Sequence, residues 1–299
     1  YNALFHRRDL TRSIQELRER EDPVRCDLSS HPDSLERRGG TPHTLYKGIA
    51  TVSLPEMRRA EVGIMLTTIM ARVQTPSLTA HNACRTRHTA EARGRAHLAY
   101  YKALERRGEV TFIKSKDDLE RSVTAWQDPQ PDTPVGLILS MESADPILDA
   151  DDVESWWEAG LRVVGPAHFG HNTYIHGTFT EGGLKPPARP LYEAMRAAGM
   201  ILDITHMADQ AVWESLDLWD GPVMASHCVS RSVVPGQRHL ADDMVAELAR
   251  RGGIIGLVFC QNFIDPDIAW REDLWNERRP ARYGMEGLVP HIEQIAELV

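Results

Sequence analysis

Four side chains that can bind metal stand at the ends of consecutive apolar runs of strand length. Each of Glu142, His168, His206 and His227 follows such a run. Burying a carboxylate is costly unless it is paired or bound to a metal. Imidazole nitrogen together with carboxylate oxygen suits zinc, although manganese and iron accept the same kinds of ligand. The pattern indicates a metal or catalytic site, and the alternative is that each histidine is a core residue with its hydrogen bonds satisfied.

The elements around these four residues repeat in a regular order, in which a helix ends at a glycine and an apolar strand follows. This is the repeating unit of a parallel α/β fold. No glycine-rich phosphate loop is present, so a nucleotide-binding sheet is disfavoured and a (β/α)8 barrel of the TIM type is the better interpretation. In such a barrel the C-terminal strand ends face the active site. The predicted strands are 62–68, 110–113, 135–140, 162–165, 200–204, 222–225 and 254–259, and the predicted helices between them are 86–107, 116–126, 151–159, 189–198, 208–218 and 242–251.

The length of 299 residues fits one large barrel domain over 1–299, since such barrels take about 250 residues. Residues 22–52 are rich in Pro, Gly, Ser and Arg and show no periodicity. We interpret them as an irregular insertion, with a mobile tip around 37–41.

Composition limits the possible partners and compartments. The net charge of -9 gives no reason to expect nucleic acid, and no apolar run is long enough for a membrane span. Four cysteines without a CxxC pair fit a reducing compartment, and we expect a cytoplasmic protein. No leader is visible, although the chain begins abruptly at Tyr1. Trp213 or Trp219 could form part of a homodimer face, but packing of a helix on the barrel is the preferred role.

Several motifs together resemble the membrane (renal) dipeptidase family of metallopeptidases, which are amidohydrolase-like barrels. The resemblance covers nearly the whole chain and includes the 21-residue and 11-residue spacings from His206 to His227 and from His227 to Arg238. None of the motifs is specific alone, but the combination is. The motifs are SMESAD at 140–145, GPAH at 165–168, ILDITH at 201–206 and ASH at 225–227.

The resemblance implies a role for each of these positions. Glu142 resembles a carboxylate that bridges two zinc ions, and His206 and His227 resemble the other protein ligands of the second zinc. His168 resembles the histidine that polarises the scissile carbonyl or stabilises the tetrahedral oxyanion. Arg238 resembles the residue that binds the substrate's C-terminal carboxylate, for which a guanidinium fork is suited. The implied activity is hydrolysis of dipeptides by a hydroxide held between two ions.

Alternative roles remain for two of these residues, since His168 could cap its loop and Arg238 could be a surface salt-bridge partner. The family also has an early His-x-Asp pair that ends its first strand and a late aspartate after its eighth. No such pair ends a predicted strand here, and 1–4 and 292–299 resemble segments next to those strands. We therefore expect a segment that lacks the first and last strands of the barrel.

Three functions stay open from the sequence. The first is the zinc dipeptidase. The second is another barrel hydrolase acting on a different amide; many such enzymes bridge their metals with a carboxylated lysine, but no lysine ends a core strand and Lys185 lies in a proline-rich loop. The third is a non-catalytic barrel that has lost the first metal site.

Overall fold

The computed structural model of the chain describes residues 2–5, 8–20, 50–73, 83–264 and 284–299. The chain forms two compact units, one of Tyr1–Ile69 with Arg93–Leu139 and the other of Met70–Ala92 with Ser140–Val299. Most of the insertion predicted at 22–52, including its tip at 37–41, lies outside the described residues.

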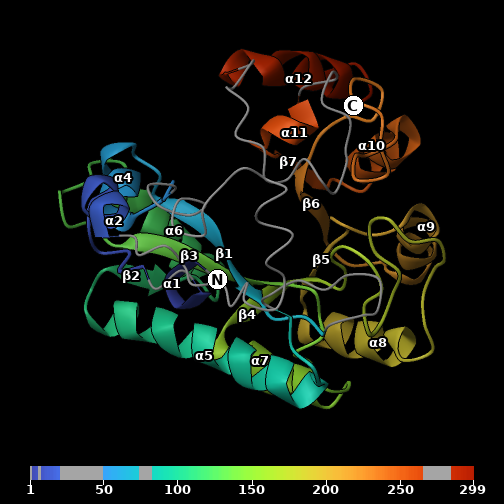
Figure 1. The fold of residues 1–299 in the computed structure, drawn as a ribbon, viewed down its shortest axis with the longest axis horizontal. Helices are drawn as coiled ribbons and strands as arrows, with labels where there is room; N and C mark the ends of the chain where they lie inside the picture. Colours follow the sequence, from blue (N-terminus) through green and yellow to red (C-terminus); the bar gives the residue numbers. More distant parts are fainter. Residues whose placement is uncertain (1, 6–7, 21–49, 74–82, 265–283) are drawn as a thin grey trace, which may run out of the picture. The chain divides into compact units, whose positions relative to one another are not determined.

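The first unit contains short parallel strands and the helices that follow them (Figure 1). Strand β2 pairs with β3 in parallel, with Val110 opposite Val135. Three elements, β1, α5 and β3, continue across the boundary between the units along the chain. The elements are α1 Asn2–Phe5, α2 Ile14–Arg20, α4 Leu54–Arg59, β1 Ile64–Met70, α5 Arg87–Arg106, β2 Val110–Phe112, α6 Lys116–Ala125 and β3 Val135–Glu142.

The second unit contains four parallel strands in the order β4-β5-β6-β7, with connecting helices α8, α9 and α10 on one side of them (Figure 1). Because neighbouring strands are parallel and follow one another in sequence, their C-terminal ends meet at one edge. The elements are β4 Leu161–Gly165, β5 Ile201–Asp203, β6 Val223–Cys228, β7 Ile254–Leu257, α7 Asp152–Ala159, α8 Ala188–Ala198, α9 Asp209–Leu218, α10 Asp242–Arg250, α11 Gln261–Ile264, the 3-10 helix η3 Met285–Leu288 and α12 Val289–Ala296.

Local sequence explains how these helices end and pack. Helices α7 and α8 end at Gly160 and Gly199, which have φ values of 115° and 77°, and such left-handed caps favour glycine. Trp219 is buried, donates its indole N–H to the carbonyl of Pro222 and packs edge-on against Tyr192. Trp219 therefore packs its helix inside the unit, as preferred from the sequence.

Most predicted elements are observed to within two or three residues, but two strands are longer than expected. Strand β3 continues through Glu142 and β6 continues through Cys228, so Glu142 and His227 belong to their strands instead of following them. The short helix α4 was not predicted; Ser53 precedes it and Pro55 stands in its first turn, which is a favourable helix start. Among the described residues, no helix combines the length and apolarity that crossing a membrane requires.

Candidate metal centre

The ends of strands β3 to β6 bring the four predicted side chains together within the second unit. Glu142 is the last residue of β3 and His227 lies in β6, while His168 and His206 each stand three residues beyond the ends of β4 and β5. The structure therefore brings all four of these side chains together at one edge.

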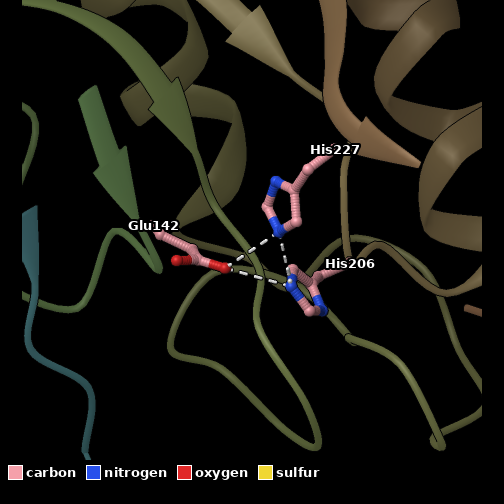
Figure 2. A group of neighbouring side chains, drawn as sticks. All are labelled: Glu142, His206 and His227. Carbon is pink, nitrogen blue, oxygen red and sulfur yellow. Dashed lines mark hydrogen bonds and ion pairs between the residues drawn. The ribbon is translucent and has the colours of Figure 1, made fainter. Parts of the chain in front are cut away.

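Three of them form a compact triangle of donor atoms (Figure 2). The Oε1 atom of Glu142 lies 3.0 Å from Nε2 of His206 and 3.3 Å from Nε2 of His227. The two Nε2 atoms are 3.2 Å apart. Among the described residues, these three form the one group of such side chains with ligand atoms close enough to share an ion.

The triangle has the size that a tetrahedral zinc ion needs. Zinc binds histidine nitrogen and carboxylate oxygen at about 2.0–2.2 Å, so neighbouring ligand atoms of a tetrahedral ion lie about 3.3–3.5 Å apart. The three observed separations, from 3.0 to 3.3 Å, approach that length. Small movements of the side chains would therefore admit an ion with one coordination position left open.

An unusual backbone conformation places His206. Its φ is 68°, in the left-handed region that residues other than glycine seldom adopt. The carbonyl of His206 accepts hydrogen bonds from the backbone N–H of Thr178, at 2.8 Å, and from its hydroxyl, at 3.2 Å. The ring packs 4.3 Å from that of His168 and 4.7 Å from that of Phe169. The β4–α8 loop therefore supports the conformation that turns His206 toward Glu142.

His168 is held on its other side by an arginine that the sequence did not reveal. Nη1 of Arg72 lies 2.9 Å from Nδ1 of His168 and donates to the carbonyl of Phe169 at 2.7 Å. A guanidinium can only donate, so Nδ1 of His168 is the acceptor and the hydrogen of the neutral ring is on Nε2. That atom lies 3.5 Å from Oε1 of Glu142. Asn172 closes the loop by bonding the backbone of His168, so the ring is not its cap.

Burial and neighbouring charges favour the protonation states that metal binding requires. Burial lowers the pKa of His168 to about 3 and, with Arg238 next in importance, holds the pKa of His206 well below its usual value. Burial alone would raise the pKa of Glu142, but the surrounding histidines outweigh it and lower that pKa well below normal. Neutral imidazoles facing an ionised carboxylate are the forms that ligate metal.

Arg238 lies beneath the same strand ends and is 2% exposed. Its Nη2 donates to the carbonyl of His227 at 2.8 Å, its Nη1 contacts the sulfur of Cys228 at 3.4 Å, and the guanidinium lies over the ring of Phe263. No carboxylate pairs with it among the described residues, and its Nε has no hydrogen-bond partner there. The alternative of a surface salt bridge therefore does not describe this residue.

Two further histidines and a lysine in the loop after β4 lie outside the triangle. His171 and His176 pack against each other, and Nδ1 of His176 contacts the carbonyl of Gly183. Lys185 donates its ammonium to the carbonyl of Asn172. Lys185 is therefore held by a backbone carbonyl outside the triangle.

Several residues that support the site were not predicted from the sequence. Asp203 and Ser226 contact each other behind His227, and Asp145 accepts backbone hydrogen bonds from Val73 and Thr173. The motifs noted in the sequence include Asp145, Asp203 and Ser226, so these residues could have been singled out. The residues that they contact could not be deduced from the sequence. Arg72 sits in a predicted loop with no motif around it.

Comparison with known proteins shows the family to which the chain belongs. Residues 41–299 match the sequence pattern of the family described as membrane dipeptidase (peptidase family M19). An uncharacterised protein encoded in the PQQ-III 3' region of Acinetobacter calcoaceticus is 25% identical over 60% of this chain and 56% of its own length. The dipeptidase tcpJ of Claviceps purpurea is 28% identical over 47% of this chain and 31% of its own. The chain thus spans about half the length, or less, of these two curated relatives.

A solved structure shares the fold. A metallo peptidase from Rhodobacter sphaeroides, crystallised with a phosphinate mimic of the dipeptide L-Ala-D-Ala, superposes with a TM-score of 0.70 at 23% identity. The match covers 91% of this chain and 79% of that one. The fold class predicted from the sequence is confirmed at the level of an α/β fold with parallel strands. With the family pattern matched over most of its residues, the chain belongs to the membrane dipeptidase family of metallopeptidases.

Proposed function

We propose that this protein hydrolyses dipeptides with the help of metal held by Glu142, His206 and His227. The observation that carries the proposal is the triangle of Oε1 and two Nε2 atoms, 3.0–3.3 Å apart, in a chain of this family. A metal ion bound there would supply Lewis acidity and a nucleophilic hydroxide at neutral pH. The dipeptidase tcpJ and the peptidase with its L-Ala-D-Ala mimic support a dipeptide as the substrate.

Zinc is the proposed metal because of the donor set, with two ions per active site. Glu142 turns only Oε1 toward the histidines, so its second oxygen is available to bridge to another ion. The ligands of that other ion are not found among the described residues, where the three-residue group stands alone.

Two side chains are proposed to handle the substrate itself. The Nε2–H of His168 points toward the metal triangle and would donate a hydrogen bond to the scissile carbonyl as its oxygen gains charge. Arg238 is a buried cation without an acid partner among the described residues, and burying a charge is costly unless it is paired. A substrate's C-terminal carboxylate would provide that pair.

The cellular setting is a further part of the proposal. The four cysteines of the sequence include no CxxC pair, which supports a reducing compartment such as the cytoplasm. A homodimer, considered from the sequence, stays a prediction that sedimentation of the purified protein would test.

Replacing Glu142 tests the proposed function directly. Glu142→Gln should abolish release of amino acids from dipeptides by the zinc-loaded protein and remove bound zinc, because an amide is a much poorer ligand than a carboxylate. Glu247→Gln is a matched control, since the side chains of Glu142 and Glu247 are 22% and 20% exposed and Glu247 pairs with Arg250 and Arg251 at the end of α10. The proposal would be overturned if Glu142→Gln hydrolysed dipeptides as fast as wild type. It would also be overturned if zinc-loaded wild type hydrolysed none. Hydrolysis of a different amide alone would favour the second kind of hydrolase.

A further inference from the structure

Behind His227, on the side away from Glu142, lies a short chain of hydrogen bonds. The hydroxyl of Ser226 lies 2.8 Å from Nδ1 of His227 and donates to Oδ2 of Asp203. Asp203 ends β5 and is 8% exposed. The chain therefore links the end of one strand, through its neighbour, to a proposed metal ligand.

The two oxygens of Asp203 are fully committed to donors. Oδ1 accepts the backbone N–H groups of Thr205 and Ser226, each at 3.0 Å. Oδ2 accepts the hydroxyl of Ser226. An ionised carboxylate has only acceptor sites, so the single hydroxyl hydrogen of Ser226 is directed at Asp203.

This arrangement determines which nitrogen of His227 carries hydrogen. The hydroxyl hydrogen of Ser226 is donated to Asp203. The hydroxyl oxygen of Ser226 can therefore only accept a hydrogen bond from Nδ1 of His227. Nδ1 must then carry the hydrogen, and Nε2 keeps a lone pair aimed at Glu142 and His206. We propose that Asp203 and Ser226 are positioning residues that hold His227 in the tautomer that ligates metal, an inference that rests on the proposed metal site.

The neighbouring histidines show that this control is specific to His227. His168 is held in the opposite tautomer, since Arg72 donates to its Nδ1. Nδ1 of His206 is buried without a hydrogen-bond partner among the described residues, and the ring is fixed by packing and backbone geometry. His227 has the most exposed side chain of the three, at 34%, so a hydrogen-bonded support replaces the packing that it lacks.

Asp203→Asn provides a sharp test because it nearly preserves shape. The two backbone N–H groups at Oδ1 would select the amide oxygen for that side, which turns the NH₂ group toward Ser226. Ser226 would then accept from Asn and donate to Nδ1 of His227, which moves the ring hydrogen to Nε2. Ser226→Ala removes the link, whereas Ser226→Thr retains a hydroxyl and should preserve the wild-type tautomer.

Two measurements on the full chain test the proposal. In the metal-free protein, long-range ¹H–¹⁵N spectra of the His227 ring should show hydrogen on Nδ1 in wild type and Ser226→Thr and on Nε2 in Asp203→Asn. Zinc affinity should fall about 10- to 100-fold in Asp203→Asn and Ser226→Ala. Asp152→Asn is the control, because its carboxylate accepts the backbone N–H of Leu148 outside the site, and it should bind zinc like wild type.

The outcomes separate this inference from the proposed function. If Asp203→Asn and Ser226→Ala both keep hydrogen on Nδ1 and bind zinc as tightly as wild type, the positioning role is wrong. If wild type binds no zinc while the tautomer still changes as described, the hydrogen-bond chain is real and the metal site fails. If Asp203→Asn does not fold, the contrast between Ser226→Ala and Ser226→Thr decides the question in the same two measurements.

Discussion

Arg238 is a buried charge that keeps hydrogen-bond donors available for a ligand. Its guanidinium bonds the carbonyl of His227 and the sulfur of Cys228, which uses two of its five N–H groups. The remaining donors can grip a carboxylate in a bidentate manner. The free C-terminus that distinguishes a dipeptide from an internal peptide bond is the group that this residue would recognise.

Arg238→Ala should therefore lower kcat/KM for a dipeptide with a free C-terminus. A charge-assisted bidentate contact contributes roughly 1.5–3 kcal/mol, equivalent to a loss of about ten- to a hundredfold. Arg238→Lys keeps the charge without the fork and should recover part of that loss. The measurement compares a dipeptide with its C-terminal amide in the zinc-loaded protein. An equal loss on both substrates would show that Arg238 supports the fold or the metal site instead.

At the same scale, the side chains that gather at the triangle could be predicted from the sequence, while the residues that support them could not. Each of Glu142, His206 and His227 could be recognised because it stands at the end of an apolar strand. That position is visible within a single segment of the sequence. The contacts of Arg72 with His168 and of Asp203 with Ser226 join different segments. Their partners follow from the packed geometry and not from any local pattern.

Among the secondary-structure elements, the strand ends were the feature from which most of the site could be predicted. The repeat of helix, glycine and strand placed β4 to β7 correctly to within a few residues. The lengths of β3 and β6 were underestimated because polar residues near a strand end look like loop in the sequence. The left-handed conformation of His206 was also unpredictable, since the hydrogen bonds that stabilise it come from Thr178, 28 residues earlier.

Helix α5 carries a buried histidine whose titration should affect stability. His97 is 3% exposed, and burial, with Arg93 nearby, lowers its pKa to about 4 from the usual 6.5. The unfolded chain therefore takes up a proton at higher pH than the folded one. The stability that His97 contributes is present above about pH 6.5 and is lost as the pH falls toward 4.

His97→Gln should make the free energy of unfolding less dependent on pH across this range. Between pH 6.5 and pH 4, wild type should lose about 3 kcal/mol more of its free energy of unfolding than the variant loses. Urea unfolding of wild type and variant at pH 4, 5 and 6.5 provides the comparison, and the acid sensitivity of the variant should be the smaller. Parallel pH profiles would mean that His97 titrates normally in the folded protein.

On the scale of the whole molecule, the candidate site is confined to one of the two compact units. Each donor atom of the triangle, and each residue that orients it, belongs to Met70–Ala92 or Ser140–Val299. In α/β barrels, the C-terminal strand ends serve the active site more than the core. Removing a ligand should consequently cost metal and activity while the fold persists.

The most direct test of that claim is zinc binding by equilibrium dialysis, with far-ultraviolet circular dichroism and dipeptide turnover on the same samples. Wild type should bind zinc. Loss of a supporting residue can weaken metal binding by about 100-fold, and His206→Ala and His227→Ala should each weaken zinc binding by more than that. Both variants should also lose dipeptide turnover and keep the wild-type spectrum. If either variant binds zinc like wild type, or unfolds while metal-free wild type remains folded, then the histidines are core residues and not ligands.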